Sequence, residues 1–283
     1  MSIVTRFAPS PTGYLHLGHA FSALLAWCRA REAGGRFLLR LEDIDPTRCR
    51  PQFAAAILED LTWLGLDWDG EVRVQSQHFA EYRAALDALA ARGLLYPCFC
   101  TRADIRQSAA APHTPDGVPR YPGTCRGLSQ DQRDARIAAG EPSALRLHMD
   151  RALATLGNAA TLTFEAAGEG TIRCHPEQFG DVVLARKDAP ASYHLCVTHD
   201  DALQGVTLVT RGEDLKPATH LHRLLQALMG WPAPIYAHHP LLTDASGRRL
   251  AKRDRAATLR ELRAEGRSPA DVRAMASPPR TSG

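Results

Sequence analysis

The sequence predicts an α/β protein built on a parallel, doubly wound sheet of the Rossmann type. Short runs of β-branched and apolar residues alternate with longer segments whose apolar residues recur at helical spacing. Several of these longer segments stop at a glycine, as at Gly34 and Gly93. Strands that alternate regularly with helices are typical of parallel sheets with crossover helices.

Residues 1–95 are expected to form the first half of this sheet. The β-branched run 3–5 and the apolar run 36–41 predict buried strands, and 72–75 is a short strand candidate. The alanine-rich segment 20–30 predicts a helix, and so do the apolar spacings of two further segments, 53–64 and 79–92.

Residues 96–179 differ from the preceding residues in composition and in the pattern of predicted elements, and they are expected to form an inserted subdomain. They contain a loop rich in proline and glycine (112–127), a short helical segment after Ser129, and short strand candidates at 144–148 and 161–165. The regular alternation breaks off here, so this segment does not continue the winding of the sheet.

Residues 180–243 are expected to form the second half of the parallel sheet. Strands are predicted at 180–185, 206–210 and 235–242, and helices at 193–203 and 215–229. A charged loop (244–255) and terminal helices, including 256–265, complete residues 244–276. The proline-containing tail 277–283 is expected to be disordered.

Composition sets limits on location and partners. The 283 residues are 45% hydrophobic and carry a net charge of +3, which permits contact with nucleic acid without requiring it. No secretory signal and no apolar run of about 18 residues is found, so a cytoplasmic protein without a membrane span is expected. The seven unevenly spaced cysteines argue against a disulfide framework. A monomer is the default expectation.

The stretch from Arg6 to His19 predicts a phosphate site. It runs from a strand through a loop with two prolines and a glycine into a helix, and His16 and His19 stand where that helix begins. A helix N-terminus offers unpaired N–H groups and partial positive charge to a phosphate. Imidazoles at that position can donate hydrogen bonds to phosphoryl oxygens. The plainer interpretation is a strand–helix connection with two surface histidines.

Three cysteines in the inserted segment suggest a structural zinc site. Cys98, Cys100 and Cys125 supply three thiolates, one ligand short of the tetrahedral set. His113 is a chemical candidate for the fourth place. The alternative is three free cysteines in a segment with little core of its own, which a metal would hold together.

Several motifs are similar to those of one enzyme family. His16-Leu17-Gly18-His19 resembles the His-x-Gly-His signature of class I aminoacyl-tRNA synthetases, and the Lys252 segment (250–253) stands where their second signature loop belongs. Further similarity to the glutamyl branch lies in residues 6–13, 40–45, 193–195 and 211–215. The resemblance covers about residues 3–260 and implies the class I synthetase catalytic fold.

Within this branch the chain resembles the truncated paralogues, the glutamyl-Q tRNA(Asp) synthetases. Few residues follow the second signature, whereas a full glutamyl-tRNA synthetase continues into a helical anticodon-binding region. Segments 98–101 and 200–207 also look more like the paralogues. The resemblance implies activation of L-glutamate with ATP and Mg²⁺. The glutamyl group would then pass to queuosine in the anticodon of tRNA(Asp).

The resemblance also implies roles for individual residues. Arginine binds carboxylates bidentately, so Arg6 and Arg211 would hold the carboxylates of glutamate, while Glu42 would receive its ammonium group. The whole implied glutamate site comprises Arg6, Phe7, Ala8, Pro9, Ser10, Glu42, Tyr193 and Arg211. The implied ATP site comprises His16, Gly18, His19 and Lys252, of which the two histidines and the lysine would be catalytic.

The resemblance implies a tyrosine as the fourth zinc ligand. The implied set is Cys98, Cys100, Tyr121 and Cys125, with His113 as the competitor. One departure from the family lies beside Lys252, where Arg249 replaces the usual first lysine and Ala251 the serine.

Two other functions are compatible with the same motifs. The chain could be a catalytic fragment of a conventional glutamyl- or glutaminyl-tRNA synthetase, which charges a 3′-terminal adenosine. It could also be a catalytically inactive synthetase-like module that binds nucleic acid. The intact histidines and Lys252 argue against the inactive module, whereas the altered residues around Lys252 keep that hypothesis open.

Overall fold

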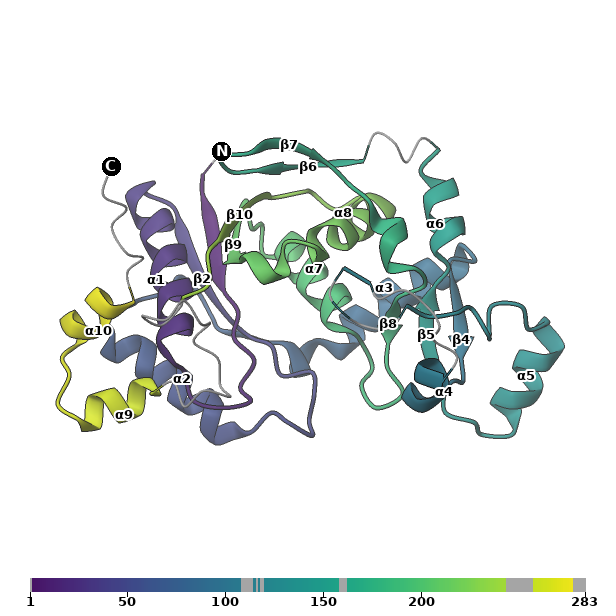
Figure 1. Cartoon of the computed structure of the whole chain (residues 1–283), viewed down its shortest axis with the longest axis horizontal. Helices are drawn as coiled ribbons and strands as arrows, with labels where there is room; N and C mark the ends of the chain where they lie inside the picture. Colours follow the sequence, from purple (N-terminus) through teal and green to yellow (C-terminus); the bar gives the residue numbers. More distant parts are fainter. Residues whose placement is uncertain are drawn as a thin grey trace. The chain divides into compact units, whose positions relative to one another are not determined.

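A computed structural model describes residues 2–107, 114–115, 117, 120–157, 162–242 and 257–276. The described residues form two compact units, and most of their elements are labelled in Figure 1. The first unit draws on residues 1–76, 205–214 and 234–283, and the second on residues 77–204 and 215–233. Among the helices of this described part, none is long and apolar enough to cross a membrane.

The first unit contains the parallel strands that the sequence predicts. Its strands are β1 (Val4–Phe7), β2 (Arg36–Leu41), β3 (Arg73–Val74), β9 (Leu208–Gly212) and β10 (Ile235–His239). Strands β1, β2 and β3 pair in parallel in that order, and β9 pairs in parallel with β10. The amide of Thr207, just before β9, donates to the Val4 carbonyl at 3.0 Å. Strand β1 therefore lies between β2 and β9, which confirms the prediction of a parallel α/β sheet.

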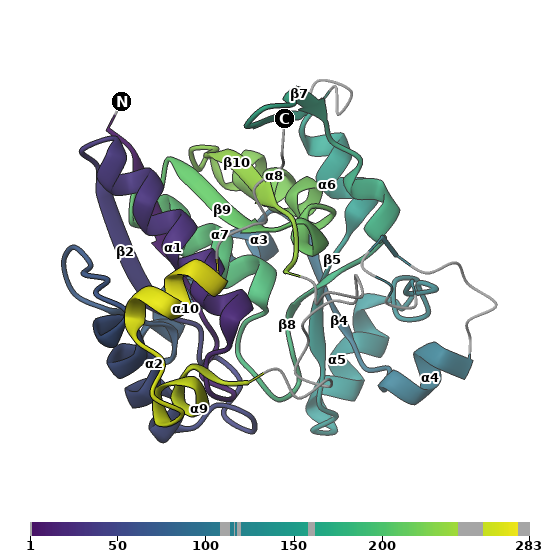
Figure 2. The same ribbon diagram turned by 60° about the vertical axis from the view of Figure 1, so that its left-hand side comes forward.

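Four helices pack around this sheet. They are α1 (Leu17–Glu32), α2 (Pro51–Trp63), α9 (Leu259–Ala264) and α10 (Pro269–Met275). Helix α1 presents fully buried alanines to β1 and β2, and small side chains let the helix approach the strands closely. The C-terminal helix α10 contacts α1, as Figure 2 shows. The shared core joins β1, β2, α1, α2, α9 and α10.

The second unit is antiparallel where it contains strands. Its helices are α3 (Phe79–Ala91), α4 (Arg102–Gln107), α5 (Gln130–Ala138), α6 (Met149–Thr155), α7 (Tyr193–Leu203) and α8 (Ala218–Met229). Its strands are β4 (Leu95–Cys98), β5 (Ala144–Leu147), β6 (Thr163–Ala166), β7 (Gly170–Arg173) and β8 (Val183–Ala185). Strands β4, β5 and β8 form one antiparallel sheet, and β6 and β7 form a hairpin. Helices α3 and α8 both pack against α7.

The structure corrects three details of the sequence prediction. Segment 180–185 is predicted to continue the parallel sheet, and this is wrong, because β8 pairs antiparallel with β5. Strand β10 ends at His239 rather than at residue 242, since Pro240 has no N–H to donate to a neighbouring strand. Helix α9 begins after residue 256, where the Thr258 side chain caps its first turn. The predicted limits of the inserted subdomain, residues 96 and 179, stay a prediction.

Candidate active site and metal centre

The carboxyl ends of β1, β2 and β9 lie at one edge of the parallel sheet. Strand β1 has β2 on one side and β9 on the other, so the chain winds in both directions from β1. Ligands of open α/β sheets bind outside the strand ends at such a switch point. Most of the predicted glutamate and ATP residues of the first unit lie in or directly after these strands, which makes this edge the candidate active site.

Two buried arginines stand on neighbouring strands of this edge. Arg6 in β1 is 5% exposed and Arg211 in β9 is 6% exposed. Arg6 Nη1 donates to the carbonyl oxygen of Thr210 at 3.3 Å, so Arg6 reaches the residue directly before Arg211. Buried arginines on neighbouring strands are suited to a ligand with two carboxylates, because a guanidinium group binds a carboxylate bidentately.

Glu42 follows β2 at the same edge. Its amide donates to the carbonyl oxygen of Pro9 at 3.0 Å, which ties the two strand-end loops together. Its Oε1 lies 3.7 Å from Nε of Arg40, a fully buried arginine in β2 that the sequence analysis did not single out. A charged residue inside an otherwise apolar strand is the signal that could have found it. Arg40 steadies the Glu42 carboxylate at the strand end.

The neighbouring acids organise the loop after β2. Asp43 accepts hydrogen bonds from the amide and hydroxyl of Ser76, at 2.8 and 2.6 Å. Asp45 accepts from the amide and hydroxyl of Thr47 and pairs with Arg48. Both carboxylates hold this loop in place through these contacts, and the predicted contact of Glu42 with an ammonium group stays a prediction.

The segment after β1 contributes in different ways. The side chain of Phe7 lies in the hydrophobic core, so only its main chain could face a substrate. Pro9 is buried, and its carbonyl oxygen is taken by Glu42. Ser10 is exposed, as a hydroxyl that binds substrate requires. Ala8, between Phe7 and Pro9, is partly buried. Their contacts with glutamate stay a prediction.

His16 and His19 form a capping pair at the N-terminus of α1. His16 is the N-cap residue, and its Nδ1 accepts from the Gly18 amide at 3.1 Å. His19 Nδ1 accepts from the His16 amide at 3.2 Å. A neutral imidazole that accepts at Nδ1 carries its proton on Nε2. Both rings are therefore set up to donate from Nε2, as contact with a phosphoryl oxygen requires.

Gly18 allows this pair to be so compact. A Cβ atom at residue 18 would lie 3.1 Å from Cε1 and 3.2 Å from Nδ1 of the His16 ring. The centroids of the two imidazole rings are only 3.9 Å apart. Gly18 thus makes room for the His16 ring against the first turn of α1, while its predicted contact with ATP stays a prediction.

Two predicted residues need separate mention. Lys252 lies outside the described residues. The described segment that follows it, which begins at residue 257, forms hydrogen bonds with residues at the start of the histidine motif. The Leu259 amide donates to the Leu15 carbonyl at 2.8 Å, and Thr258 forms an isolated β-bridge with His16. Tyr193 belongs to the second unit, where it begins α7, and its part in the glutamate site stays a prediction.

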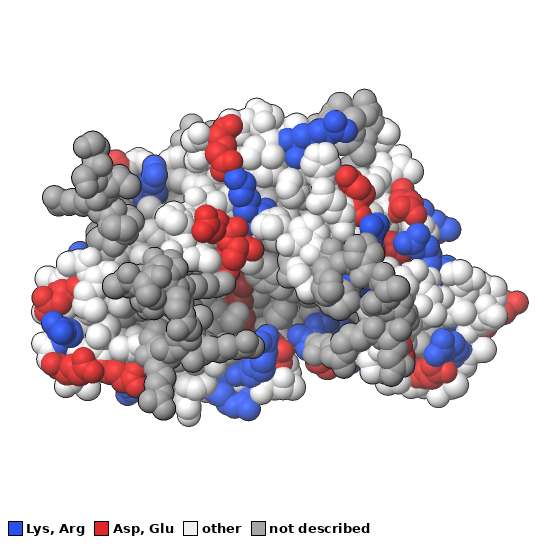
Figure 3. Space-filling view, in the orientation of Figure 1, with Lys and Arg blue, Asp and Glu red and all other residues white. Residues whose placement is uncertain are grey.

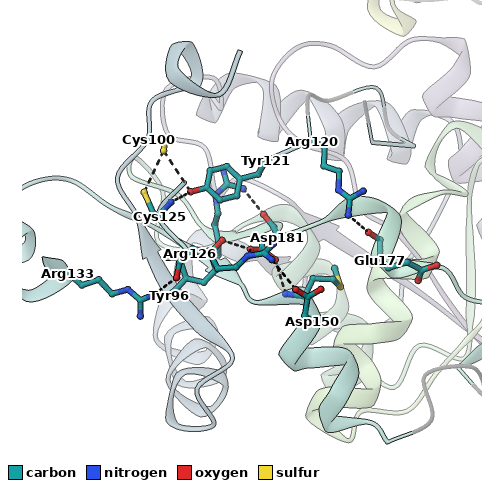
Figure 4. Close-up of polar contacts among 12 residues, drawn as sticks. Tyr96, Cys100, Arg120, Tyr121, Cys125, Arg126, Arg133, Asp150, Glu177 and Asp181 are labelled. Atoms are coloured by element: carbon teal, nitrogen blue, oxygen red, sulfur yellow. Dashed lines mark hydrogen bonds and ion pairs between the residues drawn. The ribbon is translucent and has the colours of Figure 1, made fainter. Parts of the chain in front are cut away.

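The second unit brings together the predicted zinc ligands. The sulfurs of Cys98, Cys100 and Cys125 all lie within 4.8 Å of one another. Cys100 Sγ lies 3.6 Å from Cys125 Sγ and 3.8 Å from Tyr121 Oη (Figure 4). A tetrahedral zinc ion bound to thiolates at about 2.3 Å would separate two sulfurs by about 3.8 Å. The spacing fits such an ion, whereas His113 lies outside the described residues.

The thiols of this cluster differ in acidity. Burial, followed by the neighbouring Cys125 and Cys98, raises the pKa of Cys100 to about 11. Burial alone would also raise the pKa of Cys125. The hydrogen bond from the Phe99 amide and the one with the Tyr121 side chain lower it, however, and the pKa of Cys125 lies below the ordinary value. Cys125 is thus the thiol that gives up its proton most readily among these two.

A buried carboxylate anchors the segments that carry these ligands. Asp181 is 1% exposed and accepts from Arg126 Nε at 2.7 Å, from the Tyr96 hydroxyl, and from the Met149 amide. Arg126 directly follows Cys125, and Tyr96 lies in β4 two residues before Cys98 (Figure 4). Sequence analysis missed Asp181, because nothing local links it to the cysteines.

Arg146 completes this support. It lies in β5, and its Nη1 donates to the main-chain oxygen of Asp181 at 2.7 Å. Its guanidinium carbon lies 3.8 Å from the centre of the Tyr121 ring. A cation over an aromatic face is attracted to it, so Arg146 fixes the orientation of that ring.

Comparison with known proteins shows which family the chain belongs to. The family model of class I tRNA synthetases (E and Q), catalytic domain, matches residues 2–275. The chain belongs to this family. A glutamyl-Q tRNA(Asp) synthetase of Rhodobacter capsulatus is 52% identical over 96% of this chain and 98% of its own length. A protein of the same name from Nocardia farcinica is 48% identical over 95% of this chain and 82% of its own length.

Solved structures of the class I synthetases show the same fold. A glutamate tRNA ligase from Elizabethkingia meningosepticum matches with a TM-score of 0.74 and 28% identity. The match covers 90% of this chain and 52% of that ligase, so the chain spans about half its length. Because the family model matches nearly the whole chain and close relatives are named synthetases, the chain is a ligase of the aminoacyl-tRNA synthetase type.

Proposed function

We propose that this enzyme activates L-glutamate with ATP and transfers the glutamyl group to queuosine in the anticodon of tRNA(Asp). One observation carries the first half of the proposal. Arg6 and Arg211, two buried arginines, stand on neighbouring strands at a sheet edge, and β1 leads from that edge to the histidine-capped end of α1. A site for a dicarboxylate thus adjoins a site for phosphate.

Activation needs little covalent chemistry from the protein. A glutamate carboxylate oxygen attacks the α-phosphorus of ATP, and the bond to the leaving pyrophosphate breaks. Catalysis of this kind rests on positioning and on stabilising the charge that develops on the phosphoryl oxygens. His16 and His19 would donate from Nε2 to those oxygens, and Lys252 would contact the phosphates. Mg²⁺ bound with ATP would neutralise further charge.

The glutamate residues divide the substrate between them. Arg211 and Arg6 would bind carboxylates, and Glu42, steadied by Arg40, would accept the ammonium group. Ser10 and Tyr193 would add hydroxyl contacts. Glutamine has a similar size but carries only one carboxylate, so it could not occupy both of the carboxylate contacts that this proposal assigns to the arginines.

We further propose that Cys98, Cys100, Cys125 and Tyr121 hold a structural zinc ion. The spacing of the sulfurs and of the Tyr121 oxygen supports this assignment. The ion would join β4 to the 121–125 segment, whose Tyr121 and Cys125 lie in a small apolar cluster with Tyr96, Cys98 and Phe99. Such a metal contributes to folding rather than to the reaction.

The acceptor is proposed from the relatives. Two relatives that this chain matches over at least 82% of their length are named glutamyl-Q tRNA(Asp) synthetase, and both exceed 45% identity. A glutamate–tRNA ligase from Aquifex aeolicus is 39% identical, but the match covers only 55% of its length. The names of the two more similar relatives favour queuosine over a 3′-terminal adenosine as the acceptor. On the face drawn in Figure 3, basic and acidic side chains of the described residues are interspersed rather than gathered in one basic patch.

Glutamate-dependent exchange between ATP and pyrophosphate tests the activation step. The proposal requires exchange with L-glutamate, and little or none with L-glutamine or L-aspartate. Failure of exchange both with and without tRNA would instead support the catalytically inactive module. Exchange followed by charging of tRNA(Glu) would support the conventional synthetase fragment.

A further inference from the structure

The side chain of Arg211 lies against two residues of the neighbouring strand β10. In the parallel pairing of β9 and β10, His238 is the direct partner of Arg211, and Tyr236 is the partner of Val209. Tyr236 and His238 are two positions apart, so both side chains project from the same face of β10. That face therefore presents both rings to the Arg211 side chain.

The contact with His238 has a defined direction. Arg211 Nε donates to His238 Nε2, with 3.4 Å between the two nitrogens. A guanidinium group has only donors and keeps its proton in proteins, so His238 must accept at Nε2. The imidazole is thus neutral with its proton on Nδ1. Neither an imidazolium ion nor a hydrocarbon side chain could make this contact.

Tyr236 contributes a second contact to the same guanidinium group. The Arg211 guanidinium carbon lies 5.2 Å from the centre of the Tyr236 ring, within the range of a cation–π interaction. The Tyr236 ring is 2% exposed and lies nearly parallel to the His238 ring, with 5° between the planes. The Arg211 side chain is thereby restrained by its Nε atom and by its flat face.

These restraints fix the orientation in which the guanidinium group meets a ligand. A carboxylate binds arginine bidentately through two of its nitrogens. Because Nε is turned toward His238, the rotation of the guanidinium group is fixed, and with it the direction in which the edge formed by Nη1 and Nη2 points. Holding that edge in advance lowers the ordering cost of binding glutamate.

We propose that His238 is a positioning residue, which orients Arg211 for the carboxylate of glutamate. This inference rests on the proposed function, since it presupposes that Arg211 binds that substrate. His238 does not itself touch glutamate in this proposal. Its effect should therefore fall on recognition of glutamate and not on that of ATP.

The test compares three single variants of the full chain in ATP–pyrophosphate exchange. His238→Leu removes the acceptor, and His238→Gln restores an accepting oxygen at a similar distance from the backbone. His239→Leu is the matched control, because the next histidine makes its contacts with a different element. The buried His239 ring contacts α1 through Ser22 Oγ at 3.1 Å and through the Phe21 ring.

His238→Leu is expected to raise the KM for glutamate roughly tenfold while the KM for ATP stays within about twofold, as for a misplaced binding group. His238→Gln should recover most of that loss, and His239→Leu should leave both KM values near those of the wild type. Equal rises in both KM values, or equal effects of His238→Leu and His239→Leu, would overturn the inference. So would a failure of His238→Gln to improve on His238→Leu.

The wild type separates this inference from the proposed function. Absence of glutamate-dependent exchange in the wild type would refute the proposed function and this inference with it. Normal exchange in the wild type with an unchanged KM for glutamate in His238→Leu would refute only the inference.

Thermal unfolding of each variant shows whether it is folded at the assay temperature. If His238→Leu is unfolded there, His238→Asn takes its place. The shorter side chain of asparagine should also raise the KM for glutamate, and a wild-type KM would overturn the inference.

Discussion

Arg6 Nη1 donates a hydrogen bond to the main-chain oxygen of Thr210 at 3.3 Å, across a sequence separation of 204 residues. This bond joins β1 to β9 immediately before Arg211. The two arginines expected to bind glutamate thus belong to one edge of one sheet, although the chain between their strands includes nearly all of the second unit. The geometry of the candidate site therefore depends on the contact between β1 and β9.

Arg211→Ala should abolish activation of glutamate while the protein remains folded. Loss of a buried bidentate arginine should lower kcat/KM for glutamate by at least about 100-fold, because the substrate carboxylate would lose its cation. ATP–pyrophosphate exchange measures this effect, and circular dichroism checks the fold. Arg83→Ala, which changes a 70% exposed arginine on α3, should exchange normally. Wild-type exchange by Arg211→Ala would remove Arg211 from the site.

Gly18→Ala should slow the formation of glutamyl adenylate. The added Cβ would press on the His16 ring at 3.1 Å, and moving that ring would disturb the hydrogen bond that we propose it donates to the phosphate. We expect kcat to fall about tenfold, with a small change in the KM for glutamate. Gly127→Ala is the control, because a Cβ there would meet no atom within 4 Å. Single-turnover kinetics would contradict this account if the two variants formed adenylate equally fast.

Asp181→Asn should loosen the proposed zinc ion without removing a ligand. The amide keeps the shape of the carboxylate but lacks the charge that pairs with Arg126, so Cys125 would be held less firmly. Substituting a residue that supports a metal ligand typically lowers the affinity for the metal by about 10- to 100-fold. Release of zinc to a chelator, followed by a colorimetric indicator, measures this effect.

Two comparisons make the zinc experiment decisive. Asp150→Asn changes the 73% exposed partner of the same arginine and should release zinc at the wild-type rate. Cys100→Ser should lower the zinc content after purification. Equal release by Asp181→Asn and Asp150→Asn would show that Asp181 does not support the centre. Full zinc in Cys100→Ser would contradict the ligand assignment itself.

Asp60→Asn should change the dependence of stability on pH. Asp60 lies in α2 at 3% exposure, and its Oδ2 has no hydrogen-bond partner among the described residues. Burial, and then the neighbouring Glu59, raise the pKa of Asp60 from 3.8 to about 6. The folded state therefore favours the protonated acid more than the unfolded state does. Stability from this group is complete below pH 4 and is lost as the pH rises through about 6.

The expected size of the Asp60 effect is about 3 kcal/mol, from about two units of pKa at 1.36 kcal/mol each. Because asparagine does not ionise, the stability of Asp60→Asn relative to the wild type should improve between pH 4 and pH 7. Urea unfolding at both pH values measures the difference. A relative stability that stays constant or declines over this range would contradict a raised pKa.

Local patterns in the sequence were sufficient for much of the fold. Helix α8 was predictable because its leucines recur at helical spacing, and Gly230 ends it with a positive φ of 66°. The pairing of β8 was not, because an apolar strand gives no information about its partner or its direction. In the structure its partner is β5, which lies more than 30 residues earlier in the chain.

The residues of the candidate site also fall into those that the sequence could identify and those that it could not. His16, Glu42 and Arg211 could be identified because they stand in motifs that resemble a known family. Asp181 could not, because its role depends on atoms brought close only by the folded chain. Such supporting residues leave no local pattern, and structure was needed to find them.

The central claim is the identity of the acceptor, and transfer of labelled glutamate to purified tRNA(Asp) tests it most directly. The wild-type enzyme would be given ATP, labelled glutamate and tRNA(Asp) prepared either with or without queuosine, with tRNA(Glu) in parallel. We predict stable labelling of the tRNA(Asp) that contains queuosine and none of the other two. Labelling of tRNA(Asp) without queuosine, or of tRNA(Glu), would contradict the account.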